Sequence, residues 1–261
     1  MPRIATNLVF VIVAVFSVTA SCVSLHADDE PAIGLSDERV LELIDELQQG
    51  EEETRRLAAR ALRDSGTRDE RVIMALGRAT RDRDTQVYSL SVDALARLGA
   101  DAAPAINFLI DRLEDSDQQK RYRAAYALGS MGSASVPTLQ EIISANAGRY
   151  RTEAAVRALS WAGKDAALAI PSLVAALANE KEDVADAACE TLWKIGDVSA
   201  DALLASLTSD NAQVRRLAAQ SLGHIEGSHP EWSSSIVPLL TDSDAGVRAA
   251  ATESFASLAR R

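Results

Sequence analysis

The stretch from residue 85 to residue 99 reads TQVYSLSVDALARLG, and its spacing decides the fold. Apolar or small residues recur at steps of four, four and three: Val87, Ser91, Leu95 and Leu98. This spacing places them on one face of an α-helix. Gly99 follows directly, where a left-handed backbone ends a helix without steric cost. The stretch therefore predicts an amphipathic helix that a neighbouring helix can approach closely over Ser91.

The same pattern recurs every 30 to 33 residues, which is typical of a repeat protein. One large apolar residue marks the centre of each copy: Leu62, Leu95, Leu128, Leu159, Leu192, Leu222 and Phe255. A small residue precedes each centre by four positions, and glycine follows five of the centres by four positions: Gly66, Gly99, Gly132, Gly163 and Gly196. A second column of Leu or Ile, about 20 residues upstream of each centre, predicts a partner helix.

Each copy is thus a helical hairpin that cannot cover its own apolar face, and stacking the copies buries that face. We predict an all-α fold, an α-solenoid of about seven helical hairpins over residues 36–261. The composition agrees, because 47 alanines and only 4% aromatic residues suit closely packed helices better than strands. A length of 261 residues with 47% apolar residues also excludes a disordered tail and a disulfide-stapled mini-protein.

The second helices often open with a Val-Arg pair, as in Val214-Arg215 and Val247-Arg248. With the small-residue columns, this pattern resembles HEAT repeats, and most closely the short bacterial bilin-lyase-type (PBS lyase) HEAT-like repeats. The resemblance covers Ser36 to the C-terminus. It implies a solenoid that presents a curved surface to other proteins, with an enzyme or an enzyme accessory factor of the bilin-lyase group as the alternative.

The N-terminus has the order of an export signal. Arg3 precedes an uninterrupted apolar run from Leu8 to Phe16, which is too short for a membrane-spanning helix. We predict a signal peptide over residues 1–21, or up to 27, and a linker over residues 22–35. Thr19-Ala20-Ser21-Cys22 resembles a lipobox, so lipidation of Cys22 competes with ordinary cleavage. The chain is therefore expected in the periplasm or cell envelope.

Residues suited to catalysis or metal binding are few. His224 and His229 have Glu226 nearby, which we interpret as a polar helix end rather than a metal site. No His-Glu dipeptide occurs, so the di-iron chemistry of the deoxyhypusine hydroxylases in the wider HEAT-like group is not implied. Cys189 falls on the buried side of a helix, where a thiol acts as a small apolar group. We expect no enzymatic activity, no cofactor, no metal and no small-molecule substrate.

The candidate binding site comes from the helical frame. Positions opposite the core stripe of the second helices carry five of the seven Tyr and Trp residues of the chain. The candidate partner-binding residues are Tyr122, Tyr126, Tyr150, Arg157, Trp161 and Trp193. Exposed rings beside arginine are typical of interface hot spots, although the same rings could simply pack between neighbouring second helices.

A column of arginines near the start of the second helices predicts a ladder of ion pairs. The arginines are Arg55, Arg121, Arg215 and Arg248, and the resemblance implies acidic partners in the adjoining turns, with Asp117, Asp210 and Asp244 as the expected ones. The net charge of −11 and these interleaved acids argue against a nucleic-acid partner. We therefore predict a non-enzymatic scaffold of the bacterial cell envelope that binds a protein or an extended peptide.

Overall fold

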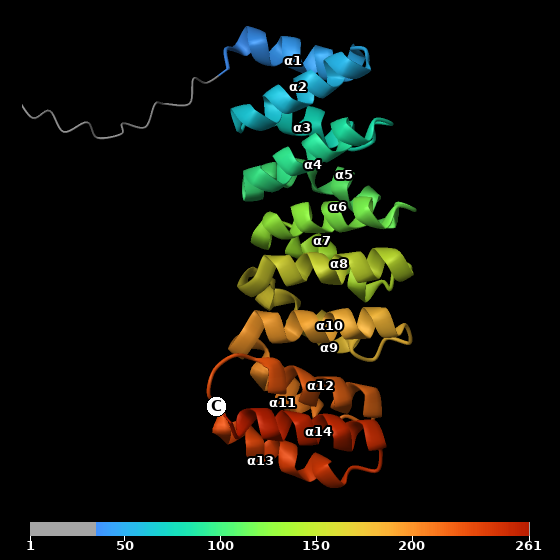
Figure 1. The fold of residues 1–261 in the computed structure, drawn as a ribbon, viewed down its shortest axis with the longest axis vertical. Coiled ribbons are helices and arrows are strands. Elements are labelled where there is room, and N and C mark those ends of the chain that lie inside the picture. The colour runs from blue at the N-terminus through green and yellow to red at the C-terminus, as the bar shows by residue number, and fades with distance from the viewer. Residues whose placement is uncertain (1–34, 261) are drawn as a thin grey trace, which may run out of the picture. The chain divides into compact units, whose positions relative to one another are not determined.

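The computed structural model describes residues 35–260, and every regular element in that range is a helix. The helices form seven successive pairs stacked in chain order (Figure 1). The pairs are α1 (Asp37–Gln49) with α2 (Glu52–Ser65), α3 (Glu70–Ala79) with α4 (Thr85–Leu98), α5 (Ile106–Ile110) with α6 (Gln118–Ser130), α7 (Val136–Ser144) with α8 (Arg149–Ala162), α9 (Ile170–Ala176) with α10 (Glu182–Ile195), α11 (Ala200–Ser206) with α12 (Ala212–His224), and α13 (Ser233–Ile236) with α14 (Ala245–Leu258). The predicted all-α solenoid of seven hairpins is confirmed.

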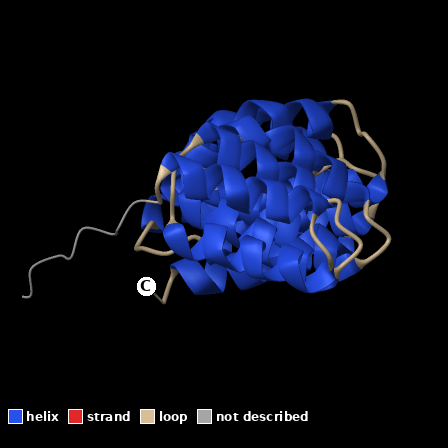
Figure 2. Ribbon diagram, turned by 90° about the horizontal axis from the view of Figure 1, so that it is seen from above, coloured by secondary structure: helices blue, strands red, loops and turns tan. Residues whose placement is uncertain are grey.

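The two helices of a pair lie in two layers. In Figure 1 the second helices α8 and α10 cross in front of α7 and α9. Seen along the stack, helices fill the section and the loops gather at two opposite edges (Figure 2). The surface formed by the second helices α2, α4, α6, α8, α10, α12 and α14 is called the second-helix surface below.

The central column of apolar residues forms the core of the stack. Six of its members are at most 2% exposed, and Phe255 is partly buried. The position three residues earlier is also buried in the first six pairs: Ala59, Val92, Ala125, Val156, Cys189 and Ala219. In the last pair the equivalent Thr252 is exposed. Because only that pair has no following neighbour within residues 35–260, this position faces the next pair, and Thr252 makes the outer face polar.

Each pair packs only against the pairs directly before and after it. Extensive contacts link α2 with α4, α4 with α6, and α6 with α8, and within residues 35–260 no extensive contact skips a pair. At the α6–α8 contact, a Cβ atom added to Gly129 would lie 2.5 Å from the Trp161 Cβ atom and 2.6 Å from the Ala158 carbonyl oxygen. Only glycine fits there, and it brings the base of Trp161 directly onto α6.

The glycine column and the prolines set where helices begin and end. All five column glycines have φ between 56° and 82°, as a helix end after each centre predicts. Pro137 and Pro171 occupy the first turns of α7 and α9, where a missing amide proton matters least. Pro238 lies in the short 3-10 helix Val237–Thr241, so α13 before it has only four residues.

The arginine ladder forms partly, and its acidic partners were predicted wrongly. Arg55 donates from Nε to Asp82 at 2.7 Å, and Arg215 donates from Nε to Asp242 at 2.8 Å. Both aspartates belong to the loop of the next pair. Arg121 instead donates to the Asp115 carbonyl oxygen at 2.8 Å and makes no ion pair within the described range.

The expected partners have other roles. Asp117 and Asp244 cap α6 and α14, since each carboxylate accepts from a backbone N–H of its own first turn. Asp210 offers only its carbonyl oxygen, at 3.1 Å from Nη1 of Arg215. Arg248 bonds the carbonyl oxygen of Asp242 at 2.7 Å. The ion pairs therefore join successive hairpins rather than the turns within one hairpin.

The structure does not describe residues 1–34, which include the predicted leader 1–21, Cys22 and all but the last residue of the predicted linker 22–35. The leader, the linker and the lipidation of Cys22 therefore stay predictions. Between residues 35 and 260, no helix is both long enough and apolar enough to cross a membrane.

Candidate functional site

Three aromatic residues form a cluster on α6 and α8. The Trp161 ring lies 4.7 Å from the Tyr122 ring and 5.7 Å from the Tyr126 ring, and its plane is almost perpendicular to both, at 87° and 86°. Such edge-to-face contacts are favourable. The tyrosines remain 51% and 49% exposed, while Trp161 is partly buried. Trp161 therefore positions two rings whose surfaces remain open to a partner.

Tyr150 and Arg157 extend this cluster on α8. Tyr150 is 52% exposed, and the guanidinium carbon of Arg121 lies 4.4 Å from its ring centre, a cation–π contact. Arg157 is held by its Nε bond of 3.0 Å to Glu153. A small hollow of about 40 Å³ lies among Arg121, Tyr122, Tyr150, Glu153 and Arg157. Five of the six candidate residues thus lie around one place.

Trp193 lies apart from the other five. Its ring contacts the His224 ring at 5.8 Å and the Lys194 ammonium at 5.7 Å. It borders a larger hollow of about 550 Å³ between α10 and the end of α12, lined also by Ile195, Val198 and Ile225. The candidate residues therefore divide into an aromatic cluster (Tyr122, Tyr126, Tyr150, Trp161, with Arg157) and a separate tryptophan.

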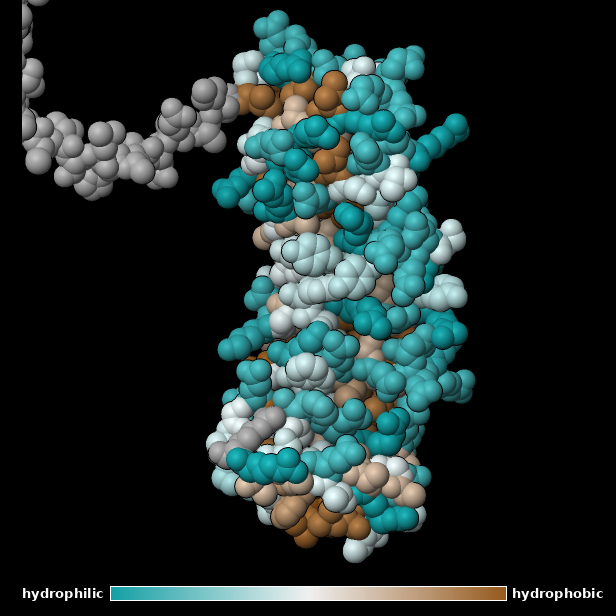
Figure 3. Space-filling view, in the orientation of Figure 1, coloured by the Kyte–Doolittle hydropathy of each residue, from teal (hydrophilic) through white to brown (hydrophobic). Residues whose placement is uncertain are grey.

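The rings can be interpreted either as a binding surface or as packing between second helices, and each interpretation fits part of the cluster. Trp161 packs between second helices, as the structural interpretation expects, because Gly129 lets it do so. The three tyrosines are about half exposed and do not fill the core. Figure 3 shows this face of the molecule, with pale side chains of intermediate hydropathy over α6 and α8 below a more hydrophilic region.

The other candidate groups are not arranged for chemistry. Cys189 is buried, its Sγ lies 3.2 Å from the Ser221 hydroxyl, and burial raises its pKa to about 11. A thiol with that pKa is a poor nucleophile near neutral pH. The His229 ring stacks on Trp232 at 3.9 Å and pairs with Asp197 at 3.2 Å. Within residues 35–260 no group of three His, Cys, Asp or Glu side chains could hold a metal ion.

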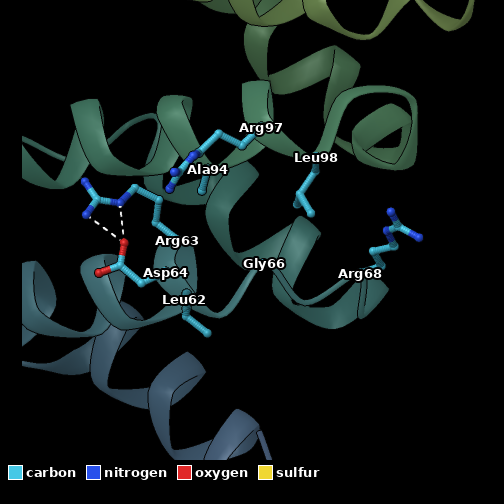
Figure 4. A pocket seen from close by; sticks show the side chains of 8 residues that line it. All are labelled: Leu62, Arg63, Asp64, Gly66, Arg68, Ala94, Arg97 and Leu98. Atoms are coloured by element: carbon cyan, nitrogen blue, oxygen red, sulfur yellow. Dashed lines mark hydrogen bonds and ion pairs between the residues drawn. The ribbon is translucent and has the colours of Figure 1, made fainter. Parts of the chain in front are cut away.

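Sequence reasoning missed an arginine-lined hollow near the ends of α2 and α4. Its volume is about 300 Å³, and Arg63, Arg68 and Arg97 line it with Asp64 (Figure 4). Arg63 pairs with Asp64 at 2.7 Å, and Arg68 pairs with Asp101 at 2.8 Å. Figure 4 shows Arg63 and Arg97 extending to one side and Arg68 to the other. The helical frame placed Arg97 on this surface, but an isolated exposed arginine gives no periodic signal.

Comparison with known families explains the fold. The family of HEAT repeats matches residues 106–193, 154–223 and 200–259, which together span more than half of the chain. The chain belongs to the HEAT-repeat family. The matches begin at the third of the seven HEAT hairpins. The two hairpins before it, α1 to α4, have the same helical-pair arrangement. No curated protein sequence matches the chain.

Several solved solenoids resemble this HEAT stack. The karyopherin Kap121p bound to the SUMO protease Ulp1p has a TM-score of 0.56 at 13% identity, over 86% of this chain and 29% of that one. The CpcE–CpcF complex of phycocyanin lyase from Nostoc sp. PCC7120 has a TM-score of 0.42 at 22% identity, over 92% and 100% of the two chains. A designed armadillo repeat protein in complex with the peptide (KR)4 has a TM-score of 0.36 at 16% identity, over 83% and 98%. The likeness to Kap121p shows the shared solenoid fold.

Proposed function

We propose that this protein is a non-enzymatic scaffold that binds a protein or an extended peptide on the second-helix surface. The observation that carries the proposal is the aromatic cluster, in which two half-exposed tyrosines contact a tryptophan fixed by Gly129 and a third, Tyr150, borders the adjoining hollow. Large rings held rigidly beside arginine supply contact area at a low cost in conformational entropy. The described residues offer no comparable arrangement for catalysis.

The scaffold acts, in this proposal, in the bacterial cell envelope. Support comes from the N-terminal sequence, in which Arg3 and the apolar run before Cys22 have the order of an export signal. Mass spectrometry of the mature chain tests this part. A diacylglyceryl group on Cys22 or a new N-terminus after Ala20 supports export, whereas an intact Met1 in the native host contradicts it.

The binding surface is tested by capture of partners from the envelope fraction. Tyr122→Ala with Tyr126→Ala removes exposed ring surface and leaves the buried core in place. Leu168→Ala is the matched control, because Leu168 is 73% exposed and lies outside the second helices. We expect the tyrosine variant to lose the captured proteins at an unchanged melting temperature, and the control to keep them. Equal capture by all three proteins would contradict the proposal, and a chromophore bound after purification would favour the lyase alternative.

A further inference from the structure

Three arginines on the second-helix surface have no partner. Three arginine side chains are exposed: Arg60 on α2, Arg97 on α4 and Arg123 on α6. None of the three guanidinium groups makes a hydrogen bond or an ion pair with any residue between 35 and 260. The neighbouring Arg56, in contrast, donates to Asp84 at 2.7 Å. The exposed Asp64 and Asp93 lie on the same face, and Arg63 contacts both, at 2.7 and 3.9 Å. Arg63 and the three unpaired arginines outnumber these two acids, so in a chain whose net charge is −11 this part of the face carries a local positive excess.

Two of the three arginines lie in line with members of the aromatic cluster along the stack, and Arg123 lies beside Tyr122 on α6. Arg60 and Tyr126 both stand two residues before the central leucine of their helices, and Arg97 and Trp161 both stand two residues after it. Each of these two alignments spans two hairpins. Neighbouring helices are about 8–10 Å apart, so the separation is about 16–20 Å. An extended peptide covers that distance with about five or six residues.

The opposite side of the cluster has no such excess. On α8 the Nε of Arg157 is paired with Glu153 at 3.0 Å, and on α10 the Nζ of Lys194 is paired with Glu190 at 2.6 Å. Arg216 on α12 has no side-chain ion pair within the described residues, but the exposed Asp186 on α10 and Glu253 on α14 offset its charge. The positive excess therefore lies on the N-terminal side of the rings. Single-stranded nucleic acid, which carries a phosphate at every nucleotide, needs a basic track along the whole groove. A short acidic block next to an apolar anchor fits this charge distribution better.

We propose that the second-helix surface binds an extended acidic segment of a partner protein. An aromatic or apolar residue of the segment lies against Tyr122, Tyr126 and Trp161. The Asp or Glu residues of the segment lie at the three unpaired arginines, the first beside the rings at Arg123 and the last about five or six positions away at Arg60. This inference rests on the proposed scaffold function and adds the chemistry and the register of its partner.

Fluorescence anisotropy with synthetic peptides tests the proposal on the full chain. The acidic probe has a Phe-Pro-Leu anchor joined to a Gly-Ser stretch of about six residues, in which glutamates replace the first, the middle and the last position. The basic probe has lysines in place of the glutamates. The test variant is Arg60→Gln/Arg97→Gln/Arg123→Gln. The control variant is Arg78→Gln/Arg83→Gln/Arg260→Gln, which removes the same charge from exposed arginines that also have no side-chain ion pair within the described range.

We expect the wild-type chain to bind the acidic probe and not the basic one. The test variant should bind the acidic probe about tenfold more weakly, as three exposed ion pairs imply, and the control within about twofold. Raising the salt concentration from about 50 to about 500 mM should weaken wild-type binding and leave the test variant nearly unchanged. A probe whose three glutamates all stand directly beside the anchor should also bind more weakly, because it cannot reach Arg60.

Other outcomes overturn the inference in distinguishable ways. If the arginine variant binds the acidic probe as tightly as wild type while Tyr122→Ala/Tyr126→Ala loses it, the inference is wrong and the scaffold proposal stands. If neither variant alters capture of the envelope proteins, the scaffold proposal fails as well. Tighter binding of an oligo-dT strand than of the acidic probe would assign the surface to nucleic acid and overturn the inference.

Discussion

The substitution Gly129→Ala measures how closely successive HEAT hairpins must approach. The new methyl group would lie 2.5 Å from the Trp161 Cβ atom and 2.6 Å from the Ala158 carbonyl oxygen. Neither atom can move by rotating a side chain, so α8 has to shift away from α6. Overpacking of this kind costs about 1–3 kcal/mol, and alanine in place of glycine returns about 1 kcal/mol of helix propensity. With two rigid contacts, we expect a net loss of about 2 kcal/mol.

Urea denaturation followed by circular dichroism at 222 nm measures this loss. The matched control is Gly246→Ala in the first turn of α14, where the nearest atoms belong to side chains and lie farther away, Asp244 Oδ1 at 3.1 Å and Arg216 Cδ at 3.2 Å. We expect the control to be as stable as wild type or slightly more stable. If both variants have the same free energy of unfolding, Gly129 is not what permits the close α6–α8 contact.

Three further predictions test the core, an ion pair and the buried thiol. Leu128→Ala should lower the free energy of unfolding by about 2–5 kcal/mol because it leaves a cavity, whereas Arg260→Ala should hardly change it. Equal urea midpoints for the two variants would refute the assignment of Leu128 to the core column of the repeats. The pKa of Asp242 is lowered to about 2 by Arg215, so this carboxylate stabilises the fold above pH 4 and loses its effect as the pH falls towards 2. Asp242→Asn should therefore be less stable than wild type at pH 7 and equal to it near pH 2, and a constant difference across that range would contradict the ion-pair role. Cys189 should resist iodoacetamide at pH 8 until the chain unfolds, which mass spectrometry of its peptide shows directly, and rapid alkylation of the folded chain would disprove its burial.

The repeat frame predicted the core because burial in a solenoid repeats with the period of the sequence. Leu62 and Leu222 occupy equivalent buried positions although 160 residues separate them. The repeat period assigns each residue to a face of its helix, but it does not predict how one hairpin is oriented relative to the next. In the structure Arg215 pairs with Asp242 of the next hairpin, rather than with the expected carboxylate of Asp210 in its own hairpin.

The same limit applies to the candidate site. The frame placed Tyr122 and Trp193 on one surface, and the structure separates them because Trp193 turns towards His224. The contact of Trp161 with α6 depends on the missing side chain of Gly129, which periodicity does not reveal. The unpaired Arg97 could be recognised only once every possible acidic partner had a position in space.

Because extensive contacts in the described part of the chain join only neighbouring hairpins, the stack can change its shape by small movements at each junction. No extensive contact within residues 35–260 skips a hairpin, so a small rotation at one junction is passed on to every junction beyond it without a second restraint. The curvature of the stack is the sum of many small angles between successive hairpins. A ligand that spans several hairpins can therefore bend or straighten the stack while each individual junction moves very little.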